Sequence, residues 1–216
     1  MFITIISKLF IGFLTTLEIF ALTLVLAVPL GLLIAFGTMS KFKPLKWLLT
    51  GFVWIIRGTP LMLQLLLVCY GPGLVGLPSV TDEKIAVIVA FVINYACYFS
   101  VIYKGGIESI TQGQREAGLV LGMTKSQIFF KIILFQVIRR IIAPMSNEII
   151  TLVKDTSLAN TLAVAEIIRV AKSFSATYAI DIIIPLLYAG AFYLIFVGLL
   201  TIIFNKIEKK MSFYKV

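Results

Sequence analysis

Long apolar runs separated by short charged stretches dominate this sequence. Three runs contain no Asp, Glu, Lys or Arg, over residues 19–40, 85–103 and 182–205. A helix rises about 1.5 Å per residue, and about 20 apolar residues cross the hydrocarbon core of a bilayer. The pattern therefore predicts membrane-spanning helices at about 9–38, 85–104 and 182–205. The first is interpreted as a retained span, because Glu18 lies in its first half and no small-residue cleavage site follows.

A fourth apolar stretch, residues 47–70, is interrupted by Arg57, Thr59, Pro60 and Gln64. A charge at the centre of a membrane helix costs about 2.5 to 3.5 kcal/mol on insertion scales. Arg57 therefore either faces a polar interior or extends along the helix to the cytoplasmic interface. Pro60 lacks a backbone N–H and disfavours helical geometry at the preceding residue. We expect a span in which polar backbone groups open near Pro60.

A fifth stretch, residues 141–165, carries Asn147, Glu148, Lys154 and Asp155. Such a helix crosses a bilayer only where protein or water covers its polar groups, so we expect it at the centre of the bundle. The segment before it, about 105–140, is too charged for the bilayer. The predicted fold class is an all-α integral membrane protein, with a single domain over residues 1–216, five transmembrane helices per protomer and a cytoplasmic loop at 105–140.

Composition and charge agree with this interpretation. Hydrophobic residues make up 60% of the 216 residues and charged residues 13%, whereas a soluble domain has about a quarter charged residues. The net charge is +9, but the bases flank apolar runs, so no nucleic acid partner is expected. Thirteen Lys and Arg residues fall on one predicted side and four on the other. This asymmetry predicts an N-terminus outside and a C-terminus in the cytoplasm.

Residue usage makes catalysis by this chain unexpected. The sequence has no His, which excludes His-based triads and HExxH zinc sites. Cys69 and Cys97 lie in apolar runs without neighbouring ligands and are interpreted as packing residues. A GxxxxGK[ST] phosphate loop is also absent. We expect no enzyme activity, no metal and no cofactor bound by the chain itself.

The charged loop has its own structural signals. Residues 114–121 fit two helical turns, Gly122 tolerates the left-handed geometry that ends a helix, and Thr124 with Gln127 fits a capping box. The loop is therefore predicted to form a short helix, a tight turn and a longer helix. From composition alone it is either a docking element for a soluble partner or an ordinary amphipathic surface loop.

Three stretches of the chain resemble one protein family. The loop sequence Glu116-Ala117-Gly118, with Gly122 four residues on and ILFQ at 133–136, resembles the EAA loop of membrane subunits of bacterial ABC importers. RGTPLMLQ at 57–64 and NEIITLVKDTSLA at 147–159 are similar to the polar amino-acid permeases of that family, which carry histidine, glutamine, arginine, cystine and opines. The resemblance runs from about Thr15 to Lys210.

Two positions depart from the family pattern. Gly118 stands where the family has a second Ala, which costs about 1 kcal/mol of helix propensity and predicts a looser short helix. Phe135 replaces a Pro, which predicts that the second helix runs on with less of a kink.

The resemblance implies a channel-forming subunit of an ATP-driven importer in the bacterial cytoplasmic (inner) membrane, working by alternating access. Its implied partners are a second permease copy or close paralogue, cytoplasmic ABC ATPase subunits that bind ATP and Mg, an extracytoplasmic amino-acid-binding protein, the amino acid, and membrane lipid. The implied ATPase-coupling residues are Glu116, Ala117, Gly118, Leu121, Gly122 and Met123.

An amino-acid substrate is a zwitterion, so its site needs donors for the carboxylate and acceptors for the ammonium group. The predicted span at 47–70 supplies donors at Arg57, Thr59 and Gln64. The predicted span at 141–165 supplies acceptors and hydroxyls at Asp155, Thr156 and Ser157. Discontinuous helices at such a depth also expose backbone groups.

Asp155 is the strongest single candidate for substrate binding. The alternative is a salt bridge from Asp155 to Lys154 or Arg57, because charges inside membranes commonly pair. Glu18 and Glu166 are weaker candidates, which either meet a basic substrate side chain or lie at an interface. Asn94 and Tyr95 are polar residues that either line the cavity or join helices.

Two other classes of function are considered. An ion-gradient-driven secondary transporter normally shows more spans or an inverted repeat within one chain. An intramembrane protease needs a catalytic pair, but Glu148 and Asp155 are about 10 Å apart by helical rise and do not share a proton. The sequence selects neither the amino acid nor a homodimer over a heterodimer.

Overall fold

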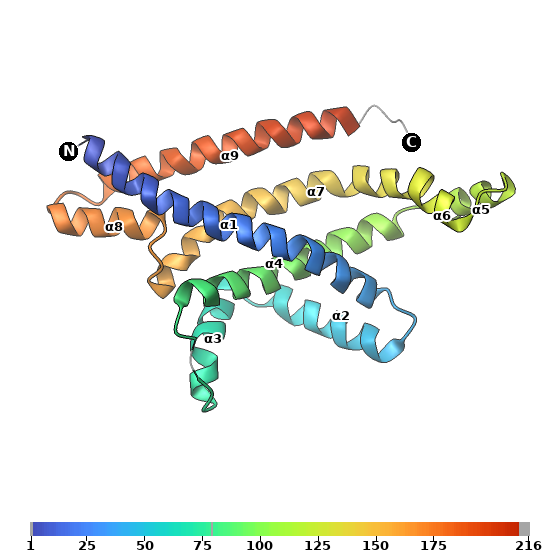
Figure 1. Ribbon diagram of the computed structural model, residues 1–216, viewed down its shortest axis with the longest axis horizontal. Coiled ribbons are helices and arrows are strands. Elements are labelled where there is room, and N and C mark those ends of the chain that lie inside the picture. Colours follow the sequence, from blue (N-terminus) through green and yellow to red (C-terminus); the bar gives the residue numbers. More distant parts are fainter. Residues whose placement is uncertain (1, 79, 212–216) are drawn as a thin grey trace.

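The computed structural model describes residues 2–78 and 80–211, and within these ranges it contains helices and no strand. Four long helices run along the longest axis of the molecule, and shorter helices lie at its two ends and along one side (Figure 1). In chain order the elements are α1 (Phe2–Thr38), α2 (Lys43–Gly58), α3 (Leu61–Leu74), α4 (Glu83–Glu108), α5 (Gln112–Val120), α6 (Lys125–Ile128), the π-helical turn η1 (Phe129–Ile133), α7 (Leu134–Asp155), the 3₁₀ helix η2 (Thr156–Leu162), α8 (Ile167–Tyr178) and α9 (Ile183–Met211).

The main core lies where α1 crosses α4. Gly31 of α1 approaches α4 so closely that an added Cβ would stand 2.9 Å from the carbonyl oxygen of Ala96. Ala27, Phe91 and Phe99 are fully buried around this contact. Small residues let membrane helices approach each other in this way, and the gain is van der Waals packing. A second apolar cluster joins the first half of α1 to α8 and α9.

Among the residues that the structure describes, three helices, α1, α4 and α9, are long and apolar enough to cross a membrane. The pair α2 and α3 would add a fourth span if the two helices are counted together. Helix α7 is not among the candidates by length and composition, because its charged and amide residues lower its hydropathy. The all-helical class is thus confirmed for the described residues, whereas the count of five spans remains a prediction.

Several predicted boundaries are wrong. Helix α1 begins at Phe2 and not near Leu9, because Ile5 and Leu9 continue its buried face. The stretch 47–70 is not one helix: α2 ends at Gly58, α3 starts at Leu61, and the two are bent by 109°. The break at Pro60 was predicted, but its angle was not.

The predicted helix at 141–165 is also corrected. Helix α7 starts earlier, at Leu134, and the α-helix ends at Asp155, where η2 follows. Hydroxyl groups of η2 donate to carbonyls three residues earlier, as from Thr156 to Val153 and from Ser157 to Lys154, which suits a tighter helix. Helix α8 then occupies residues between the predicted spans at 141–165 and 182–205, where no helix was predicted.

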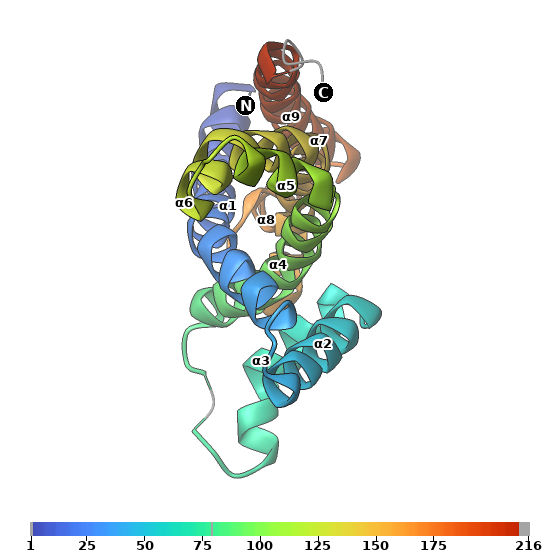
Figure 2. The ribbon, with the colours of Figure 1, turned by 90° about the vertical axis from the view of Figure 1, so that its right-hand side faces the viewer.

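The charged loop forms the predicted short helix, turn and longer helix. Gly122 has a φ of 72° and ends the first helix in the left-handed region, and both bonds of the Thr124 to Gln127 capping box are present. The longer helix continues through Phe135 without a break, and its irregularity is the π-helical turn just before it. Seen along the bundle axis, α5 and α6 stand in front of the long helices (Figure 2).

Candidate functional site

The break between α2 and α3 is held by the side chain of Gln64. Pro60 has no N–H to donate, so nearby carbonyls lose their helical partners. The Gln64 amide nitrogen donates to the carbonyl oxygens of Ile56 at 2.7 Å and Thr59 at 3.2 Å, and to the Thr59 hydroxyl at 2.9 Å. The Gln64 amide oxygen accepts from Asn94 of α4 at 3.0 Å. Both amides are buried, so the break is internally satisfied and fixed to α4.

Arg57 lies at the end of α2, immediately before this break. Its guanidinium carbon stands 5.0 Å from the centre of the Tyr98 ring on α4, which is a cation–π distance. The Arg57 side chain is otherwise exposed. The break thus presents a positive charge beside an aromatic residue of α4.

Asp155 ends α7 and is held by Tyr95 of α4. The Tyr95 hydroxyl donates to Asp155 Oδ2 at 2.7 Å, and the Tyr95 side chain is buried. A hydrogen bond to a carboxylate is among the stronger ones in proteins, so this contact fixes the position of the charge. Asp155 itself is only half-buried. Among the described residues it forms no ion pair with Lys154 or Arg57.

These contacts bring opposite charges to one face of α4. Tyr95 and Tyr98 are three residues apart, so they lie on the same helical face. Arg57 is therefore held one turn from Asp155, and Glu148 lies two turns before Asp155 on the same face of α7. We use the name charged groove for this group of five residues. It offers a cation for a carboxylate and carboxylates for an ammonium group.

The hydroxyl groups of Thr156 and Ser157 donate hydrogen bonds to backbone carbonyls. Thr156 is fully buried, donates to the Val153 carbonyl at 2.6 Å and lies 3.3 Å from the Tyr193 hydroxyl of α9. The Ser157 hydroxyl donates to the Lys154 carbonyl at 2.8 Å. Their contacts stabilise the junction of η2 with α7 and α9, and their substrate-binding roles remain predictions.

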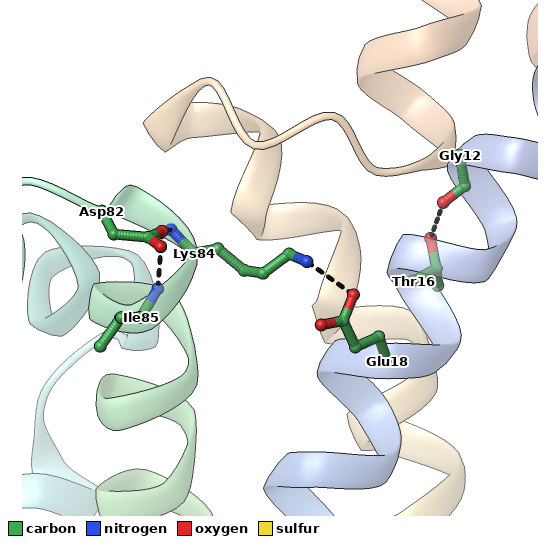
Figure 3. Close-up of polar contacts among 6 residues, drawn as sticks. All are labelled: Gly12, Thr16, Glu18, Asp82, Lys84 and Ile85. Carbon is green, nitrogen blue, oxygen red and sulfur yellow. Dashed lines mark hydrogen bonds and ion pairs between the residues drawn. The ribbon is translucent and has the colours of Figure 1, made fainter.

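Glu166 and Glu18 lie apart from Arg57 and Asp155. Glu166 is fully buried and caps α8, accepting from the backbone nitrogens of Ile168 at 2.9 Å and Arg169 at 2.7 Å. Glu18 of α1 pairs with Lys84 at the start of α4, 2.6 Å away, in a contact that remains partly exposed (Figure 3). Exposed pairs of this kind add at most about 1 kcal/mol. Neither glutamate contacts the charged groove in this structure.

Two members of the groove were not proposed from the sequence. Tyr98 was overlooked, and Glu148 was noted as a polar residue of its helix and weighed only as one half of a protease pair with Asp155. The spacing of Asn94, Tyr95 and Tyr98 within an otherwise apolar helix was the available signal, because three polar side chains on one side of a span indicate a polar neighbour.

The second feature is the unit formed by α5, its turn and α6, which we call the knob. A small apolar cluster of Ile110, Ile128, Ile133 and Val137 packs α6 against η1, α7 and the segment that follows α4. Gly118 is buried against Ile128, and an added Cβ would stand 2.7 Å from Ile128 Cγ1. Gly118 therefore permits close packing of α5 on α6, a role that helix propensity alone did not indicate.

The tip of the knob exposes apolar side chains. Val120 is 88% exposed and Leu121 77% exposed, beside the exposed residues Glu116 and Ala117. Met123 is half-buried at the turn. A hollow of about 380 Å³ beside the tip is lined by Arg115, Leu119, Lys125, Ile128, Phe129 and Ile133. Exposed apolar groups beside bases are typical of a protein interaction surface.

Comparison with known proteins gives the family. Residues 27–212 match the family described as binding-protein-dependent transport system inner membrane component. The chain belongs to this family, so it is an integral membrane component of a transport system. This agrees with the resemblance of its loop to the EAA loop.

Individual relatives and solved structures agree. The L-cystine transport system permease protein TcyB of Bacillus subtilis is 36% identical over 204 residues, covering 94% of this chain and 86% of that protein. The arginine transport system permease protein ArtQ of Bacillus subtilis is 33% identical over 203 residues, covering 93% and 91%. A crystal structure of an amino acid ABC transporter with histidines matches with a TM-score of 0.88 at 28% identity, over 97% of this chain and 96% of that chain. The MetNI methionine ABC transporter shares the fold, with a TM-score of 0.67 at 17% identity over 96% and 95%.

The role of Gln64 gives a stability prediction. Replacing Gln64 by Leu leaves the Ile56 carbonyl and the Asn94 amide without these partners, and each buried unpaired group costs about 1 to 3 kcal/mol. We expect a lower midpoint of thermal unfolding in detergent, measured by intrinsic fluorescence. Gln112→Leu is the matched control, because Gln112 is exposed and contacts only Glu116. The double variant with Asn94→Leu should lose less than the sum of the two single variants. Additive losses contradict the proposed link.

Proposed function

We propose that this chain is the membrane-spanning subunit of an ATP-driven importer of an amino acid. The knob carries the proposal: it is an exposed helical unit at one end of the bundle, with apolar side chains at its tip, which a transporter without a soluble motor does not need. Permeases for cystine and arginine are among the relatives of this chain, and an amino acid ABC transporter shares its fold.

The proposed arrangement follows the distribution of charge. The knob and the C-terminal end of the bundle lie on the cytoplasmic side, where most Lys and Arg residues fall, and the N-terminus lies outside. Helix α7 completes the set of five spans. Its polar face is covered by α4 and by a second permease copy or close paralogue. Cytoplasmic ATPase subunits that bind ATP and Mg contact the knob, and an extracytoplasmic binding protein delivers the amino acid.

The charged groove is proposed as the path of the substrate. The Arg57 guanidinium suits the substrate carboxylate, because planar guanidinium groups bind carboxylates through paired hydrogen bonds. Asp155 and Glu148 suit its ammonium group. Thr59, Gln64, Thr156 and Ser157 hold the two helix breaks that border the groove. Movement of the knob by the ATPase tilts α7, which begins beside the knob, and exposes the groove to alternate sides.

A transport assay tests the proposal. The chain is purified with co-expressed ATPase subunits, reconstituted with the binding protein, and supplied with L-cystine, L-arginine, L-glutamine or L-histidine. We expect ATP-dependent uptake of at least one of them. Uptake that follows an ion gradient without ATP would establish a secondary transporter instead.

The tip of the knob provides a coupling prediction. Leu121→Glu places a charge on an exposed apolar side chain, so we expect it to weaken ATPase attachment and ATP-driven uptake about tenfold or more without loss of membrane insertion. Gln127→Glu adds the same charge to the knob but preserves the capping box, and should transport normally. Equal activity of the two variants contradicts the docking role.

Asp155 provides a substrate prediction. Asp155→Asn removes the charge but keeps an acceptor for Tyr95, so the fold is expected to survive. Substrate-stimulated ATP hydrolysis should fall about tenfold, the size of one lost charge-assisted hydrogen bond. Glu208→Gln, at the exposed end of α9, controls for lost charge. Normal stimulation in the intact variant complex contradicts a substrate role, and failure to assemble supports a structural one.

A further inference from the structure

A second polar contact joins α4 to α7 far from the charged groove. One guanidinium nitrogen of Arg140 on α7 donates to the Ser109 carbonyl oxygen at the end of α4, at 2.6 Å. The chain runs in opposite directions along these two helices, which pack against each other (Figure 1). The Tyr95 to Asp155 contact and the Ser109 to Arg140 contact therefore mark two points on one helix pair, about 21 Å apart by helical rise.

Residues between these two points lie on the same faces as the charged groove. On α7, residues 140, 144, 148, 151 and 155 follow one another at intervals of three or four, and so share one face. On α4, residues 95, 98, 102, 105 and 109 do the same. Arg140 therefore lies on the same face of α7 as Glu148 and Asp155, toward the opposite end of the helix.

A hollow lies at the Arg140 end of this surface. Its volume is about 300 Å³, and it is lined by Val101, Ile102, Gly105, Gly106, Ser109, Arg140 and Pro144. The two glycines have different roles. An added Cβ at Gly106 would collide with Ile141, so Gly106 sets the close approach of the helices, whereas an added Cβ at Gly105 meets nothing within 4 Å. Gly105 therefore keeps the hollow open.

The charges at this hollow complement an α-amino acid. Arg140 is exposed and, among the described residues, has no ion pair with an acidic side chain. A guanidinium has five N–H donors, and the Ser109 carbonyl takes only one of them. Carbonyl groups at the C-terminal end of α4 carry partial negative charge, which suits an ammonium group.

We propose that this hollow is an exit-side binding site for the transported amino acid, in which Arg140 binds the α-carboxylate as the substrate leaves for the cytoplasm. The inference rests on the proposed function. It adds a second binding site on the proposed path. This site recognises the α-carboxylate, which all amino acids share, whereas the charged groove selects the side chain.

The test uses proteoliposomes that contain the complete transporter, with binding protein and labelled amino acid inside. Only transporters with their cytoplasmic side outward use external ATP, so external ligands reach the hollow directly. The probes are whichever of L-cystine, L-arginine, L-glutamine and L-histidine the wild type carries, and its own α-carboxamide. ATP-driven release of label is measured against external probe concentration.

We expect the external amino acid to slow release, and its carboxamide to do so about tenfold less effectively, because one charge-assisted contact is lost. In Arg140→Gln the amino acid should be as weak an inhibitor as the carboxamide is in the wild type, and Arg140→Lys should recover most of the difference. Gly105→Leu fills the hollow while leaving Arg140 in the sequence, because an added Cβ at Gly105 meets nothing within 4 Å, and it should weaken inhibition similarly. Arg139→Gln, which removes the neighbouring charge on α7, should behave as wild type.

Three outcomes overturn the inference. Equal inhibition by the amino acid and its carboxamide would show that the carboxylate is not recognised. Wild-type inhibition in both Arg140→Gln and Gly105→Leu would show that the hollow is not the binding site. An effect of Arg140→Gln that disappears in phosphatidylcholine vesicles without phosphatidylglycerol assigns the hollow to an anionic lipid. If the wild type carries none of the four amino acids, the proposed function itself fails, which is a distinct result.

Discussion

The interrupted backbone between α2 and α3 must have its hydrogen bonds satisfied inside an apolar bundle, and much of the candidate site depends on how this is done. Pro60 frees carbonyl groups of partly buried residues, and polar groups left unpaired in apolar surroundings cost several kcal/mol. The Gln64 amide supplies the missing donors and is itself held by Asn94. With the break fixed to α4 in this way, Arg57 is placed over Tyr98, one turn from the tyrosine that holds Asp155.

The helices differ in how tightly they pack against one another. The crossing of α1 and α4 has no space to spare at Gly31, so it forms a fixed frame. Helix α7 is bonded to α4 at Asp155 and Arg140 and approaches it closely at Gly106, and three α7 side chains are buried in the main core: Ile149, Leu152 and Val153. The knob is joined to the start of α7 by the small apolar cluster around Ile128 and by a hydrogen bond from the Gln136 amide to the Gln114 amide. A force on the knob therefore acts on the helix that lines the charged groove.

The sequence predicted much of this arrangement, and the failures have identifiable causes. Hydropathy located α1, α4 and α9, and local signals located the break at Pro60 and the turn at Gly122. Helix α8 was not predicted because alanine gives no turn signal. The left-handed residues before and after this helix are Ala163, which ends η2, and Ala179, which ends α8. The partner of Gln64 lies 30 residues away, so its structural role appears only in the folded chain. Arg57 and Asp155 were predicted from their cost in the bilayer; the tyrosines that position them follow from tertiary contacts.

The central claim is that ATP hydrolysis by ATPase subunits bound to the knob changes access to the charged groove. Thr151 lies on the groove face of α7 between Glu148 and Asp155, and the chain has only two other cysteine positions to remove, Cys69 and Cys97. The direct measurement is the alkylation rate of Thr151→Cys, in a background with Cys69 and Cys97 replaced by Ala, by a membrane-impermeant maleimide added from the ATPase side. The account predicts that ATP changes this rate and that the transported amino acid slows it. A rate that responds to neither ATP nor the amino acid, in a complex that still hydrolyses ATP, contradicts the account.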